Sequence, residues 1–208
     1  MPNTATGPGR PKDLTKRQAI LDDARVLFLD NGFASTSMDT VASAAGVSKL
    51  TVYSHFSDKE TLFSAAVIAT CQAQLPELLF ELRAGSSVRK VLMDIGLGFQ
   101  ALISCEESVK LHRLIIALGT QDPHLSQIFY EAGPQRILGE MEGLLRRIDD
   151  GGTLRIEHPA KAAEHFFCLV KGAPNFRLLL GCAGPLAADA AKAHVEEVVG
   201  MFERAYRP

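Results

Sequence analysis

The sequence predicts an all-α protein with an N-terminal three-helix helix-turn-helix domain and a longer C-terminal helical domain. Two observations support this fold class. Apolar residues recur with the helical period of about 3.6 residues along most of the chain, and no β-type alternation is sustained. Residues 38–56 have the pattern of two short helices around a glycine turn. We expect a flexible basic arm over 1–12, a compact domain over 13–60 and the helical domain over 61–208.

The N-terminal arm is rich in glycine, proline and threonine and has no apolar core that could serve as a secretion signal. Positive charge gathers in and just after it, on Arg10, Lys12, Lys16 and Arg17. Because affinity for DNA comes largely from phosphate neutralisation, Arg10 is a candidate DNA contact. The alternative is a disordered basic tail that touches nothing.

Helix boundaries in the compact domain follow from residues that satisfy free backbone groups. Ser37 and Ser48 are placed to cap the second and third helices, because a serine hydroxyl accepts bonds from the first N–H groups of a helix. Gly46 can take the positive φ that ends the second helix and turns the chain. Ser57 followed by Glu60 resembles a capping box that opens a fourth helix. The domain is therefore expected to end near residue 60.

The third helix is expected to present a polar face to solvent. Only Val52 and Phe56 need to point inward. The remaining polar side chains can bond to phosphates and base edges in a major groove. These candidate DNA contacts are Ser48, Lys49, Thr51, Ser54 and His55. The alternative is an ordinary helical hairpin with a solvated polar face.

The rest of the chain is predicted to be helical, with breaks at glycine- and proline-rich stretches. Pro76, Pro134 and Pro174 are expected to kink or split the segments that contain them. Residues 153–156 form a short extended candidate. The expected helical segments are 59–82, 87–104, 106–119, 122–148, 159–181 and 186–205.

Composition excludes several classes of protein. With 47% hydrophobic and 22% charged residues the chain is globular, and no apolar run is long enough to span a membrane. The four cysteines are scattered, which favours reduced thiols in a cytoplasm. A net charge of −2 does not indicate nucleic-acid binding by the whole chain, so any such binding must be local.

The helical domain contains candidate ligand contacts around a predicted apolar cavity of at least about 300 Å³. His112 and Arg113 interrupt an apolar helix and could orient a polar group of a ligand. The alternatives are a satisfied core histidine and a surface ion-pair partner. The apolar candidates are Phe99, Ile103, Phe129 and Phe166, each of which could equally be plain core.

Other chemistries have weaker support. Glu164, His165 and Cys168 lie within one helical turn, a spacing that a metal site could use, although a lone trio is more often a packed helix face. A thiol redox switch has no local feature that lowers a thiol pKa. No motif of a hydrolase, a P-loop or a dinucleotide-binding enzyme is present. We therefore expect no cofactor, no resident metal and no catalysis.

The last two helices are expected to form a homodimer interface. Val195, Val198, Val199 and Phe202 recur at helical spacing near the C-terminus, and Leu169 lies in the preceding segment. A terminal helix with such a stripe must cover either a core or a partner. Two helices from each chain would make a four-helix interface with two-fold symmetry.

Residues 10–64 as a unit resemble the N-terminal domain of the tetracycline-repressor (TetR) family. The resemblance rests on Asn-Gly-Phe at 31–33, Ala-Ala-Gly-Val-Ser-Lys at 44–49, Thr-Val-Tyr-Ser-His-Phe at 51–56 and Ser-Asp-Lys-Glu-Thr-Leu-Phe at 57–63. The rest of the chain is similar to the family in its all-helical architecture. Tyr-Glu-Ala-Gly-Pro at 130–134 resembles the AefR-like branch.

The resemblance implies a helix-turn-helix DNA-binding domain over 13–60 and a ligand-binding and dimerisation domain over 61–208. It places Ser37 and Lys59 on phosphates, Lys49 and Thr51 on base edges, and Tyr53 and His55 on the DNA backbone. Leu50 departs from the pattern, where small residues are commoner.

By this resemblance the chain is a dimeric repressor that a small hydrophobic effector releases from a palindromic double-stranded operator. The alternatives are a metal- or redox-sensing repressor, a helical enzyme with an incidental helix-turn-helix, and a nucleoid-type DNA binder without an effector.

Overall fold

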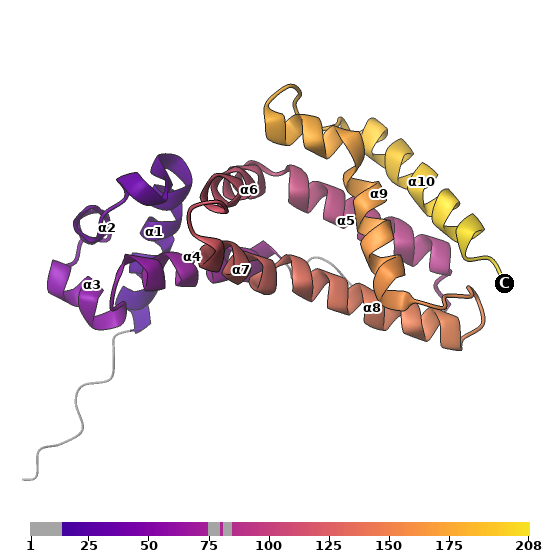
Figure 1. The fold of residues 1–208 in the computed structure, drawn as a ribbon, viewed down its shortest axis with the longest axis horizontal. Helices are drawn as coiled ribbons and strands as arrows, with labels where there is room; N and C mark the ends of the chain where they lie inside the picture. The colour runs from indigo at the N-terminus through magenta and orange to yellow at the C-terminus, as the bar shows by residue number, and fades with distance from the viewer. Residues whose placement is uncertain (1–13, 75–79, 81–84) are drawn as a thin grey trace, which may run out of the picture. The chain divides into compact units, whose positions relative to one another are not determined.

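The computed structural model describes residues 14–74, 80 and 85–208. The candidate contact Arg10 and the expected break at Pro76 lie outside these residues. Within them every regular element is an α-helix and no strand is present (Figure 1). The chain divides into two compact units, Met1–Ala66 and Val67–Pro208. The domain boundary near residue 60 stays a prediction, because helix α4 (Lys59–Gln74) begins there and continues past Ala66.

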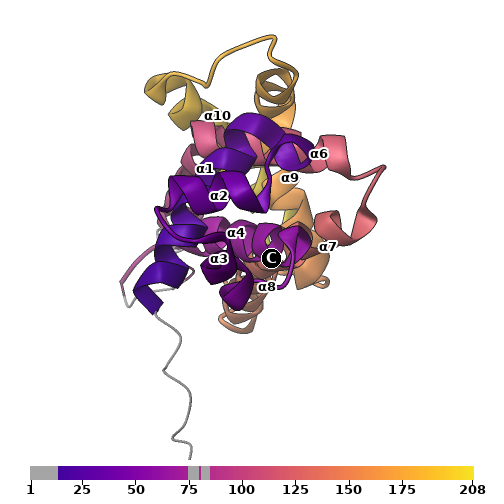
Figure 2. The same cartoon turned by 90° about the vertical axis from the view of Figure 1, so that its left-hand side faces the viewer.

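The first unit contains α1 (Leu14–Ser35), α2 (Met38–Ala44), α3 (Lys49–His55) and the first turns of α4. Helices α2 and α3 lie against α1 and against each other (Figures 1 and 2). Its core is a small set of fully buried apolar side chains. They are Ile20, Leu21, Ala24, Phe28, Val41, Val52, Phe56, Leu62 and Phe63.

Among the residues that the structure describes, the second unit contains six further helices and the end of α4. They are α5 (Val88–Ser104), α6 (Glu106–Leu118), α7 (Pro123–Ala132), α8 (Pro134–Asp150), α9 (Pro159–Leu180) and α10 (Ala188–Ala205). The segment predicted over 122–148 is split at Gly133, because Pro134 starts α8 at a position where its missing N–H costs nothing. In the described ranges, no helix is both long and apolar enough to cross a membrane.

The core of the second unit lies between α5, α8, α9 and α10, where α9 packs on α8 and α5 packs on α10 (Figure 1). Here the assignment of four α10 residues to the dimer interface needs correction. The stripe Val195, Val198, Val199 and Phe202 is at most 2% exposed and packs into this core, with the Phe202 ring edge-on to Phe166 at 5.4 Å. The stripe covers the unit's own core rather than a partner. Leu169 on α9 remains 40% exposed.

Helix α9 is kinked at Gly172, whose φ of 51° and ψ of −167° are non-helical. Pro174 follows and cannot donate the N–H that the Val170 carbonyl would receive in a regular helix. His194 of α10 replaces that donor, with its Nε2 2.9 Å from the Val170 oxygen. The kink predicted at Pro174 is therefore present, and a side chain from the neighbouring helix satisfies the backbone group that it frees.

The stretch 153–156 is not a strand. Leu154 and Ile156 are buried in the core of the second unit, and the Arg155 N–H donates to the Tyr206 carbonyl at 2.8 Å. The alternating apolar residues that predicted an extended segment belong to the connection between α8 and α9, and they cover the core.

Candidate functional site

The helix-turn-helix is held by local hydrogen bonds at the predicted positions. The Ser37 and Ser48 hydroxyls accept from the N–H groups of Thr40 and Thr51 at 3.1 and 3.2 Å. Gly46 has the positive φ of 63° between the two helices. These contacts confirm the caps and the turn, and they hold α3 at a set angle to α2.

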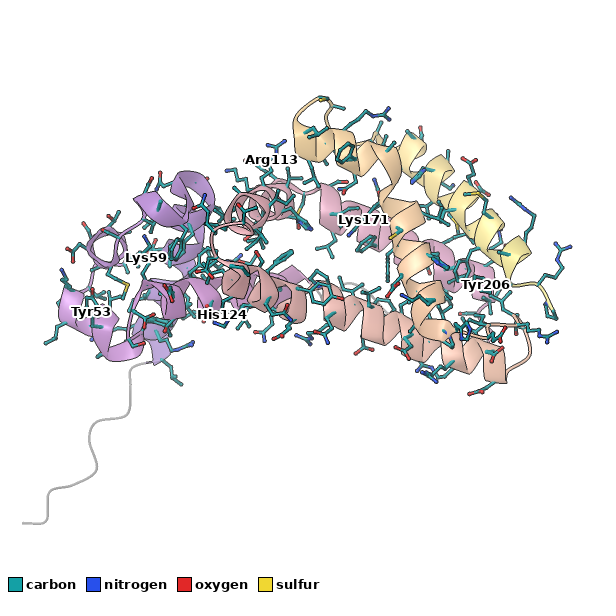
Figure 3. All side chains as sticks on the ribbon, viewed as in Figure 1. Tyr53, Lys59, Arg113, His124, Lys171 and Tyr206 are labelled. Atoms are coloured by element: carbon teal, nitrogen blue, oxygen red, sulfur yellow. The ribbon has the colours of Figure 1, made fainter. Side chains whose placement is uncertain are left out.

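The face that α3 leaves outward is polar, with one large apolar residue. Lys49, Tyr53 and Ser54 are exposed, and Tyr53 is labelled in Figure 3. Thr51 and His55 are half-buried. Leu50, the position that departs from the family pattern, is 82% exposed, so its side chain is free to touch a partner. The structure gathers these predicted residues on one helix, and their contacts with DNA stay predictions.

Lys49 has an acidic partner on the neighbouring helix. Its Nζ lies 2.9 Å from both carboxylate oxygens of Asp39 on α2. The hydrogen bond and the charge of Asp39 raise the pKa of Lys49. Both side chains are more than half exposed, at 58% and 63%, so the pair contributes little to stability. Its effect is to neutralise the one lysine on the outward face of α3.

Lys59 at the start of α4 is tied to the end of α1. Its Nζ donates to the Ala34 carbonyl at 3.3 Å and lies 4.4 Å from the centroid of the Phe33 ring. The residue that caps α4 is Asp58 rather than the predicted Ser57, because the Asp58 carboxylate accepts from the Thr61 N–H at 2.7 Å. That bond lowers the pKa of Asp58. The Ser57 hydroxyl instead bonds to two side chains, donating to Asp58 at 3.0 Å and lying 3.1 Å from the Thr61 hydroxyl.

The second unit contains a cavity of about 190 Å³. Four predicted ligand contacts, Phe99, Ile103, His112 and Phe129, lie in its wall. The volume is below the expected minimum of about 300 Å³, so any ligand that fits without rearrangement is small. The remaining wall residues are Cys71, Leu102, Ser108, Tyr130, Gly133, Pro134, Ile137, Leu138, Glu164, Phe167, Cys168 and Lys171.

Two predicted ligand contacts lie elsewhere. Arg113 caps the C-terminus of α9, where its Nη2 and Nε donate to the carbonyls of Leu178 and Leu179 at 2.8 and 2.9 Å. A helix C-terminus offers unsatisfied carbonyls with partial negative charge, which a guanidinium satisfies well. Phe166 is fully buried against Phe167 and Phe202 and is plain core.

The wall also contains polar groups that sequence reasoning missed. Ser108 lies one turn before His112 on α6, and Lys171 lies on α9 at helical spacing from Phe167. The spacing of Glu164, Phe167, Cys168 and Lys171 at i, i+3, i+4 and i+7 was the available signal for a shared face.

Cysteine and metal chemistry find little support in these residues. Glu164 and Cys168 line the cavity, but His165 is exposed, with its Nδ1 3.4 Å from the Tyr206 hydroxyl, so the predicted trio does not converge. No cluster of three metal-ligating side chains occurs among the residues that the structure describes. Burial raises the pKa of the Cys71 thiol to about 11, which keeps it protonated and unreactive at neutral pH.

Two family models match the chain. The model of bacterial regulatory proteins of the tetR family matches residues 20–66, and the model of the AefR-like transcriptional repressor C-terminal domain matches residues 90–208. The transcriptional regulator YdeS of Bacillus subtilis is 30% identical over 149 residues, which cover 71% of each chain. AcrR of Shigella flexneri is 43% identical over 85 residues, covering 38% of this chain and 39% of AcrR.

Solved structures have the same fold. A TetR-family regulator from Mesorhizobium loti is 28% identical and superposes with a TM-score of 0.84 over 96% of this chain and all of its own. The flavonoid-responsive regulator FrrA is 31% identical, with a TM-score of 0.83 over 94% of this chain and 99% of its own.

Proposed function

Because this chain belongs to the TetR family of transcriptional regulators, with an AefR-like C-terminal domain, we propose that it represses transcription from a palindromic operator until a small effector occupies the cavity. The observation that carries the proposal is a capped helix-turn-helix with a polar outward face in one unit, combined with a mostly apolar cavity in the other. The two features supply one site for DNA and a separate site for a signal.

Operator binding rests on α3. Its N-terminal residues can enter a major groove, where Lys49 and Thr51 reach base edges while Tyr53 and His55 hold phosphates. Ser37 caps α2 and leaves its helix N-terminus free for a further phosphate. Lys59 reaches a phosphate only at the expense of its contacts with Ala34 and Phe33.

A homodimer is required to read a palindrome, and an exposed stripe on α9 is the best-supported surface for it. Phe176 and Leu180 are 64% and 60% exposed, and their spacing of four residues keeps them on one face of the part of α9 that follows the kink at Gly172. Leu169, which is 40% exposed, precedes the kink. Exposed apolar side chains of this size that share one face mark an interaction surface. Two recognition helices about 35 Å apart would then read successive turns of DNA.

The effector acts by population shift. A ligand that prefers one spacing of the two recognition helices lowers operator affinity by its differential affinity for the two states. The cavity favours a small, mostly apolar molecule, because most of its wall is aliphatic or aromatic. FrrA, which shares the fold at 31% identity, responds to flavonoids, and this supports an aromatic effector.

The DNA part of the proposal can be tested by selecting a binding site from random duplexes with the purified full-length protein. Thr51→Ala should reduce discrimination between the selected site and random DNA about 5- to 150-fold, because a base contact contributes ~1–3 kcal/mol. Lys49→Ala should weaken binding to the selected site, because Lys49 is also expected to reach a base edge. Lys90→Ala is the matched control, since Lys90 pairs with Asp94 on α5 as Lys49 pairs with Asp39. Equal affinity for all sequences would instead indicate a nucleoid-type binder.

The dimer is tested by sedimentation at micromolar concentration. Phe176→Glu should give a monomer, whereas Ile116→Glu, at the similarly exposed residue of α6, should leave the dimer intact. A monomeric wild-type protein, or a Phe176→Glu variant that stays dimeric, would refute this interface.

A further inference from the structure

One hydrogen-bond acceptor in the cavity has no partner. The Nδ1 of His112 lies 2.7 Å from the Ser108 carbonyl, and because a carbonyl only accepts, Nδ1 carries the hydrogen. Burial lowers the pKa of His112, so the ring is neutral at neutral pH and Nε2 holds a lone pair. In the described part of the chain Nε2 makes no hydrogen bond. It is therefore the atom that His112 can offer to a molecule in the cavity.

One cation in the same wall is also unpaired. Lys171 of α9 is exposed, and its Nζ lies 5.9 Å from the centroid of the Phe99 ring (Figure 3). It forms no ion pair with the described residues. The only carboxylate in the wall, Glu164, is neutralised by Lys161 at 2.7 Å. The charge of Lys171 also lowers the pKa of His112, so the two side chains are close enough to interact electrostatically.

The rest of the wall suits a flat molecule. The Phe99 and Phe167 rings are 4.4 Å apart, and the His112 ring meets Phe129 edge-on at 5.2 Å. Aromatic walls favour an aromatic ligand that stacks or meets them edge-on. At about 190 Å³ the cavity accommodates only a small ring system.

From this arrangement we propose that the cavity selects a one- or two-ring aromatic acid with a hydroxyl group, in which the hydroxyl donates to His112 Nε2 and the carboxylate is held by Lys171. The proposal rests on the effector role proposed above and specifies the chemistry of the effector. A ligand without the hydroxyl leaves Nε2 desolvated and unpaired, and a ligand without the acid leaves Lys171 without a counter-charge.

Four naphthalene probes separate the two contacts by calorimetric titration of the full-length protein without DNA. 6-Hydroxy-2-naphthoic acid should bind most tightly. 2-Naphthoic acid and 6-methoxy-2-naphthoic acid should both bind about 10-fold more weakly, because one lacks the donor and the other blocks it. 2-Naphthol should bind about 5-fold more weakly through loss of the carboxylate. This comparison uses the wild-type protein, so it does not depend on any variant being folded.

Two variants assign the contacts. His112→Phe keeps the aromatic edge against Phe129 and should bring the hydroxy-to-methoxy affinity ratio to about one, while His124→Phe, outside the wall, should leave it unchanged. Lys171→Gln should remove the preference for the acid over 2-naphthol, while Lys192→Gln should not.

The hydroxyl preference should also depend on pH in one direction. Because the pKa of His112 lies below its usual value near 6.5, Nε2 accepts a hydrogen bond at neutral pH and is protonated only in more acid solution. The preference for the hydroxyl should therefore be full at neutral pH and be lost only at a pH below the usual titration range of histidine. The other titratable side chains of the wall come from α4, α7 and α9. They are Cys71, Tyr130, Glu164, Cys168 and Lys171.

Equal binding of the hydroxy and methoxy acids by the wild-type protein would overturn the proposal, as would a preference that survives His112→Phe. Failure here leaves the regulatory function standing if another compound releases the selected operator. Failure to select any operator contradicts the function without affecting the outcome of these titrations.

Discussion

The helix-turn-helix and the cavity are assembled in opposite ways. The caps and turn of the first are made by residues within three positions of each other, such as Ser48 and the Thr51 N–H. The cavity wall combines side chains from α4 to α9, separated by up to a hundred residues. The DNA-reading face is thus set by local backbone bonds, and the cavity by the packing of a large core. Changes to distant packing should alter the cavity and leave the helix-turn-helix intact.

The largest effect should come from placing a charge in the core of the second unit. Val198 is 1% exposed, so Val198→Glu buries an unpaired carboxylate and should cost at least ~3 kcal/mol. We expect the melting temperature to fall by ~6–12 °C in circular dichroism, with cavity binding lost. Lys192→Glu on the exposed side of α10 is the control. A stable but monomeric Val198→Glu protein would restore the original interface prediction for this stripe.

A smaller loss should follow at the kink of α9. A Cβ on Gly172 would lie 3.2 Å from the His194 ring and 3.3 Å from the Pro174 Cδ, at a φ that side chains rarely adopt. Gly172→Ala should destabilise the protein by ~1–3 kcal/mol in chemical unfolding. Gly139→Ala, on α8 with open space around its Cβ, should have the opposite sign and stabilise by roughly 0.5–1 kcal/mol. If both substitutions changed the free energy of unfolding in the same direction, the structural account of the kink would be wrong.

Within the first unit, removing the side chain that caps a helix should lower the stability of that unit measurably and leave the second unit unchanged. Ser48→Ala should cost ~1 kcal/mol, because the Thr51 N–H loses its acceptor. Ser57→Ala should cost clearly less, since Asp58 caps α4. Both should leave titrations of the cavity unchanged. If Ser48→Ala lowered the affinity of the cavity for its ligand, the stabilities of the two units would not be independent.

The smallest change in stability, with a clear change in binding, is expected for Asp39→Asn. It frees Lys49 from its ion pair and removes a negative charge beside the DNA-reading face. Affinity should rise for all sequences alike, and the slope of log affinity against log salt should steepen by about one. Asp94→Asn, which breaks the similar pair with Lys90, should change neither quantity. An unchanged slope would mean that Lys49 remains in place without its partner.

This contrast also explains which features could be predicted from the sequence. Gly46, Ser37 and Ser48 act on their own neighbours, so residue type and spacing were enough to place them. Phe99, His112 and Phe129 were found because they interrupt or line apolar helices.

Most of the wrong assignments concern non-local contacts. Arg113 has its partners 65 and 66 residues away on α9, and no local pattern indicates that pairing. An apolar stripe such as that of α10 looks the same whether it covers its own core or a partner. Local reasoning also chose Ser57 over the adjacent Asp58, two residue types that cap helices about equally well.

The kink at Gly172 gives α9 two separable surfaces. Every cavity residue on this helix precedes Gly172, as does Leu169, whereas Phe176 and Leu180 of the proposed dimer surface follow it. Because His194 holds the junction through the Val170 carbonyl, one half can change without redirecting the other. Under selection, the cavity contacts over 164–171 could diverge while the proposed pairing surface at Phe176 and Leu180 is inherited intact. For engineering, the residues of α9 that precede Gly172 could be replaced to sense new compounds while the residues that follow it are kept.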